Sequence, residues 1–92
     1  MLFLYTAWFR DSGLSSEVPA SEWSSCLLID AESDHDGRVW GDHLADRRAA
    51  RSVSLNFLRS TVEKAESWPK KKIEKVGRVK FGQEPPANQI GW

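Results

Sequence analysis

The sequence predicts a small α+β domain, in which a sheet of three or four strands packs one face against a single long helix. Its 92 residues are the size of one domain. Four segments have the length and composition of strands, and one segment has the small-residue stripe and end signals of a helix. The predicted strands are 2–9, 23–30, 54–63 and 74–82, and the predicted helix is 34–51.

The first two predicted strands are rich in apolar residues, and the last one is basic. Both parities of residues 2–9 are apolar, which favours a strand covered on both faces. Residues 23–30 are expected in the centre of the sheet. Within 74–82, basic residues stand at alternate positions after residue 76, which is typical of an edge strand.

The third predicted strand, 54–63, places Leu55, Phe57 and Thr61 on one parity. Because a helix separates it from strand 23–30, the two are expected to be parallel neighbours joined by a crossover. The residues after it, 64–72, have the composition of a polar loop around a Trp-Pro pair.

The predicted helix has clear signals at both ends. Ser33 can cap its first turn, where Asp34 and Asp36 complement the helix dipole, and three arginines stand in its last turns. Small residues recur every four positions, which allows close approach to a sheet. These residues are Gly37, Gly41, Ala45 and Ala49.

One helix cannot cover both faces of the sheet. The uncovered face is expected to carry Leu2, Leu4, Trp8 and Phe57, and an exposed apolar face indicates a partner. The alternative is coverage by the C-terminal tail. We place the domain at 1–82 and an extended tail at 83–92, which includes Ile90 and Trp92.

Charge is distributed unevenly along the chain. Residues 1–46 hold nine acidic and two basic residues, a net of −7, and residues 47–92 hold eleven basic and four acidic ones, a net of +7. Such polarity can mark a nucleic-acid contact, or it can reflect ion pairing inside the fold or between copies. Overall neutrality weighs against nucleic acid.

The basic segment carries the nucleic-acid alternative. Its side chains could neutralise phosphates, and Trp68 beside them could stack on a base. The residues assigned to this interface are Arg59, Lys70, Lys71, Lys72, Lys75, Arg78 and Lys80.

The acid-rich segment 34–43 is the third candidate site, for a metal or for acid/base chemistry. Glu32, Asp34 and Asp36 alternate before a glycine as in a calcium-binding loop, but the position of the bidentate glutamate holds His43. His35 and His43 are too far apart on a helix to share a metal. We therefore predict no metal site, and surface ion pairs explain the segment better.

The sequence has no Walker motif, no dinucleotide-binding fingerprint, no Gly-x-Ser-x-Gly motif and no paired Cys-x-x-Cys. This argues against the common enzyme classes and favours a protein that is not an enzyme and needs no cofactor. The lone Cys26 lies in an apolar run and is expected to be a small buried side chain. With one cysteine and no membrane-spanning or signal segment in the sequence, a cytoplasmic protein without a membrane partner is expected.

The leading hypothesis is a non-catalytic module that binds another protein or associates with itself. Its contacts are predicted to combine aromatic anchors with the basic edge strand, because tryptophans dominate binding hot spots. The partner-binding residues are predicted to be Trp68, Ile90, Trp92, Lys75, Arg78 and Lys80.

Overall fold

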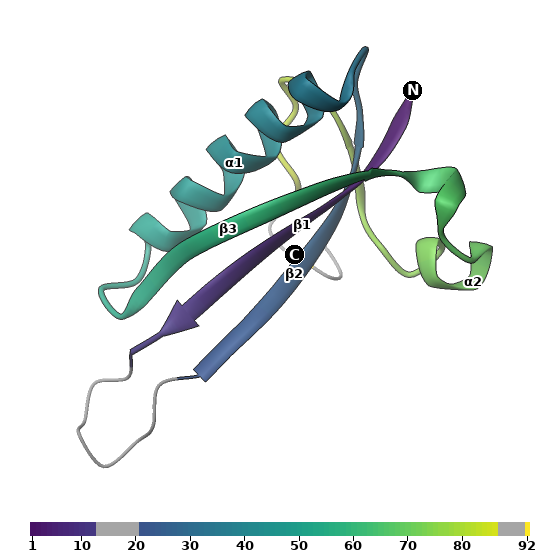
Figure 1. Ribbon diagram of the computed structural model, residues 1–92. Helices are drawn as coiled ribbons and strands as arrows, with labels where there is room; N and C mark the ends of the chain where they lie inside the picture. Colours follow the sequence, from purple (N-terminus) through teal and green to yellow (C-terminus); the bar gives the residue numbers. More distant parts are fainter. Residues whose placement is uncertain (13–20, 87–91) are drawn as a thin grey trace.

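The computed structural model describes residues 1–12, 21–86 and 92 and shows one mixed sheet with a long helix on one face (Figure 1). This arrangement confirms the predicted α+β class. The elements in chain order are β1 (Leu2–Asp11), β2 (Ser21–Asp30), α1 (Asp34–Ala50), β3 (Leu55–Lys64), the 3-10 turn η1 (Ala65–Ser67), α2 (Lys70–Ile73) and β4 (Arg78–Lys80).

The four strands lie in the order β3-β1-β2-β4. The central strand β1 is antiparallel to β2 and to β3, while β4 runs parallel to β2. β2 and β3 are therefore parallel, but β1 separates them, so the prediction that they are neighbours is wrong. The reason is that β1 and β4 occupy both edges of β2, which leaves β3 the free edge of β1.

Helix α1 begins where the sequence predicted and presents the predicted small face. The Ser33 hydroxyl accepts a hydrogen bond from the Asp36 N–H at 3.1 Å, which caps the first turn. Gly37, Gly41 and Ala45 are buried against the sheet. A Cβ at Gly41 would stand 2.4 Å from the Tyr5 ring, so the glycine is required by close packing rather than by helix propensity.

The main core fills the space between the sheet and α1. Odd-numbered residues of β1 and β2 point into it, and Val79 of β4 closes one edge. Its largest fully buried side chains are Tyr5, Phe9, Leu27, Ile29 and Val79. The Tyr5 hydroxyl donates a 2.7 Å hydrogen bond to Asp42, and burial together with this carboxylate raises the pKa of Tyr5.

The described residues of the tail lie on the α1 side of the sheet, where they contact α1 and the main core. The Trp40 Nε1–H donates to the backbone carbonyl of Gln83 at 2.9 Å, and Arg47 pairs with Glu84. Trp92 packs on the main core, with its ring centre 6.0 Å from that of Tyr5 and 6.3 Å from that of Phe9. Trp92 therefore lies on the helix side and does not cover the opposite face of the sheet.

A β-bulge changes the parity of β3. Phe9 pairs with Phe57 and Trp8 with Arg59, so Leu58 is an extra residue on the strand. Phe57 accordingly packs on Phe9 in the main core, and not on the uncovered face as predicted. The prediction that Thr61 shares a face with Phe57 is also wrong, because the bulge turns Thr61 to the other side.

Residues 65–77 connect β3 to β4 and cross the second face of the sheet, the one away from α1 (Figure 1). We call these residues the crossing segment. The sequence suggested a polar loop over 64–72, whereas the structure forms η1 and α2. Its apolar side chains pack on Leu4 and Leu28. These side chains are Ala65, Trp68, Ile73 and Val76.

Candidate binding trough on the second face of the sheet

The second face is built from rows of side chains that run across the strands. Leu4 lies opposite Leu28 and Glu63, and this row is covered by the crossing segment. In the next row, Thr6 lies opposite Cys26 and Thr61, which are all small or medium side chains. A further row places the larger Trp8 between Ser24 and Arg59.

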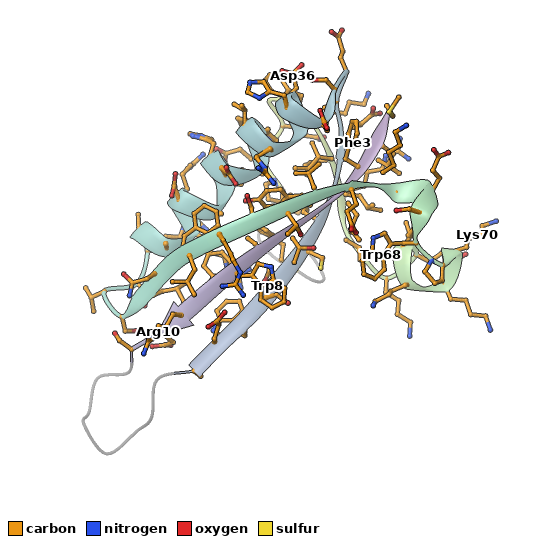
Figure 2. The ribbon with its side chains drawn as sticks, viewed as in Figure 1. Phe3, Trp8, Arg10, Asp36, Trp68 and Lys70 are labelled. Carbon is orange, nitrogen blue, oxygen red and sulfur yellow. The ribbon has the colours of Figure 1, made fainter. Side chains whose placement is uncertain are left out.

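A hollow forms where the row of small side chains lies between two larger walls. Trp8 stands at one end of this hollow, and Trp68 of the crossing segment stands at the other (Figure 2). Its volume is about 390 Å³, within the usual range of ligand pockets. We call it the Trp8–Trp68 trough; its lining is Leu4, Thr6, Trp8, Ser24, Cys26, Thr61, Glu63, Trp68, Lys72, Ile73 and Val76.

Each indole of the trough is held by charged side chains. The Arg59 guanidinium lies 4.9 Å from the centre of the Trp8 ring and forms a 2.9 Å ion pair with Glu22, so this pair spans β1 from β3 to β2. At the other end, the Trp68 indole N–H donates to the Glu63 carboxylate, and the Lys72 ammonium lies 4.3 Å from the ring centre. These contacts favour the observed orientation of each ring.

The basic residues assigned to nucleic acid do not form one continuous surface. Arg59 lies on β3, while Arg78 and Lys80 lie on β4 at the opposite edge of the sheet. Lys70, Lys71 and Lys72 belong to α2, and Lys75 follows it (Figure 2). Two of the seven, Arg59 and Arg78, already pair with Glu22 and Asp30.

Asp30 joins three parts of the chain at the end of β2. Its two carboxylate oxygens accept from the N-terminal ammonium at 3.2 Å and from Arg78 at 3.3 Å. These partners lower the pKa of Asp30. Arg78 therefore has a local role in attaching β4 to β2.

The predicted partner-binding residues fall in separate places. Trp68 lines the trough, whereas Trp92 packs in the main core. Arg78 and Lys80 lie on β4, and Lys75 precedes it. Ile90 is outside the described residues. The trough thus contains one of the six, together with Lys72 from the nucleic-acid set.

The acid-rich segment is part of the first turns of α1. Among residues 1–12, 21–86 and 92, no group of three possible metal ligands lies close enough to hold an ion. The Asp36 backbone N–H donates to the capping Ser33 hydroxyl, and the Asp42 carboxylate accepts from the Tyr5 hydroxyl. The His43 ring stacks on Trp40 with centres 5.1 Å apart.

Sequence reasoning placed Trp8 on the uncovered face but missed the floor of the trough. The missed residues are Thr6, Ser24, Cys26 and Thr61. The sequence of β1 does contain a signal for the hollow, because on the face that carries Leu4 and Trp8 the residue between them is the smaller Thr6. The depth of the hollow depends on the crossing segment, which the sequence did not indicate.

Comparison with protein-family models, with curated proteins and with solved structures finds no match to this chain. Within the described ranges, none of the helices has the length and apolar character needed to cross a bilayer.

Proposed function

We propose that this chain is a non-catalytic protein-interaction module, whose Trp8–Trp68 trough receives a large apolar side chain from a partner. The proposal rests on one observation, the open and mostly apolar hollow with a tryptophan at each end. Tryptophans that are rigidly held at the rim of a pocket are typical of binding hot spots. Because the charged side chains already hold both rings, little side-chain entropy is lost on binding.

Nucleic acid is less well supported as the partner of the same face. At the Trp8 end of the trough, the charge of Arg59 is already balanced by Glu22. Among the described residues that line the trough, Lys72 is the only cation, and it lies at the other end. The trough therefore favours an apolar side chain over a phosphodiester backbone.

Site-specific photocrosslinking tests the proposal. A benzoylphenylalanine is placed at Thr61, an exposed side chain of the edge strand β3 that lines the trough, or at Val39, which is 47% exposed on α1. Full-length protein is then irradiated in an extract of its source organism. We expect a protein adduct from position 61 and none from position 39, because only position 61 contacts the partner.

A second substitution shows whether the adduct depends on the trough. Thr6→Arg fills the hollow, so it should abolish the adduct from position 61, provided that circular dichroism shows the fold intact. An adduct of twice the chain mass identifies a second copy, and any other mass identifies a different protein. Equal adducts from both positions, or none from position 61, would contradict the proposal.

A further inference from the structure

We infer that the segment entering the Trp8–Trp68 trough carries carboxylate side chains next to its apolar anchor. This inference rests on the proposed function and specifies the chemistry of the partner. It follows from which charged side chains around the trough form no ion pair with the described residues of the chain.

The free charge at the trough is an ammonium. Lys72 lies over Trp68, and within the described part of the chain it forms no ion pair. The same holds for Lys70, Lys71 and Lys75 of the crossing segment. This segment contains four lysines and two glutamates, a net of +2 on one wall of the trough.

The lysines near the trough outnumber the carboxylates that keep their charge. Glu22 is paired with Arg59, while Glu63, which accepts the Trp68 indole N–H, and the two glutamates of the crossing segment face four lysines. When an apolar side chain enters, it removes water from the neighbouring Lys72 ammonium, and this desolvation has a cost. A carboxylate on the incoming segment offsets the cost and brings the partner to the lysine side.

The arrangement fits a short acidic segment better than a strand of phosphates. Among the described residues that line the trough, the only lysine is Lys72 of α2, whereas a nucleic-acid strand needs cations along a continuous track. The far end of the trough presents the paired Arg59 and Glu22 instead. An apolar side chain with carboxylates on one side of it therefore fits the trough, because its carboxylates can face Lys72 while no charge is needed beside the Arg59–Glu22 pair.

The two trough indoles provide a direct readout. In protein with ¹⁵N-labelled tryptophan, the Nε1–H signals of Trp8 and Trp68 are assigned by substitution and followed during titration. The main probe is a nine-residue peptide with a central Leu-Phe pair flanked by Asp and Glu. Matched probes replace Leu-Phe by Gly-Ser or the acids by lysine, and dT₁₂ serves as a phosphate strand.

We expect the acidic Leu-Phe peptide to shift both indole signals saturably, and the two altered peptides to do so much more weakly. Lys72→Glu should weaken this binding by about five- to tenfold, since it reverses a charge at the rim. Lys80→Glu, on β4 and away from the trough, is the matched control and should leave the affinity unchanged.

Three results would overturn the inference. They are equal binding of the acidic and basic peptides, a stronger response to dT₁₂, and no saturable shift of either indole. None of them contradicts the proposed function if the adduct from position 61 forms and is lost with Thr6→Arg. Conversely, failure of that adduct removes the proposed function itself.

Discussion

A single contact between Gly41 and Tyr5 sets the distance between α1 and the sheet. The Tyr5 ring lies fully buried against the glycine, and its hydroxyl reaches Asp42 on the next position of the helix. Glycine costs a helix interior about 1 kcal/mol relative to alanine. That cost is offset because no other residue lets the ring lie directly on the helix backbone.

Gly41→Ala is expected to lower the free energy of unfolding by about 1–3 kcal/mol, because its Cβ would clash with the Tyr5 ring. Gly37→Ala is the matched control. A Cβ at Gly37 would meet Phe3 at an ordinary 3.6 Å, so the gain in helix propensity should stabilise the fold by about 0.5–1 kcal/mol. Urea denaturation followed by circular dichroism measures both changes. A stabilising Gly41→Ala would contradict this account.

At the scale of the elements, local signals in the sequence predicted α1, β1, β2 and β3 to within two residues at each end, whereas β4 covers only Arg78–Lys80 of the predicted 74–82. The signals for α1 are local to the helix, so they could be interpreted without the rest of the fold. They are the capping Ser33, the aspartates of the first turn and the four-residue spacing of small residues. The extra residue Leu58 could not be predicted, because a bulge is defined only against the partner strand. The neighbours of β2 depend on non-local pairing in the same way.

The trough was only partly predictable for the same reason. Trp8 and Trp68 stand out in the sequence, but their relation depends on how residues 65–77 cross the sheet. The four lysines of that segment suggested an exposed loop, although apolar residues among them, such as Ile73 and Val76, pack on the sheet. The polar composition therefore did not indicate that this segment covers part of the second face.

The capping of α1 gives a prediction at this scale. Ser33→Ala removes the acceptor for the Asp36 N–H and should cost about 1 kcal/mol of stability. Ser33→Asp restores an acceptor and should recover most of the loss. Thermal unfolding of the three proteins distinguishes the cap from other effects of the serine. An equal loss in both variants would show that the side chain acts in another way.

Across the whole molecule, the two oppositely charged halves of the sequence are tied together. Glu22 pairs with Arg59 and Asp30 with Arg78, and each pair joins an acidic-half strand to a basic-half strand. Part of the charge asymmetry is therefore used in holding the sheet edges. Four further lysines, which form no ion pair with the described residues, lie in the crossing segment, where the inferred partner contact lies.

Trp92 acts at the same scale because it joins the tail to the main core. With Phe9 and Trp23 it surrounds the Arg48 guanidinium, whose pKa is lowered by burial and which donates to Ser25 at 2.6 Å.

Trp92→Ala should therefore lower the free energy of unfolding by about 2 kcal/mol, since a half-buried aromatic ring is lost. Phe81→Ala, at a ring that is 52% exposed, is the control and should cost less. Chemical denaturation of both variants measures the difference. If Trp92→Ala costs no more than Phe81→Ala, the ring is not part of the core in solution.

The meeting of early and late segments in one core also governs how the protein can be made. A ribosome delivers β1 and β2 first, yet their apolar side chains are covered by later segments, namely α1, β3, the crossing segment and β4. The core cannot form fully until β4 has left the exit tunnel, and domains that wait in this way expose aggregation-prone surface. The nascent β1–β2 pair is thus the stage at which chaperones would compete with misfolding.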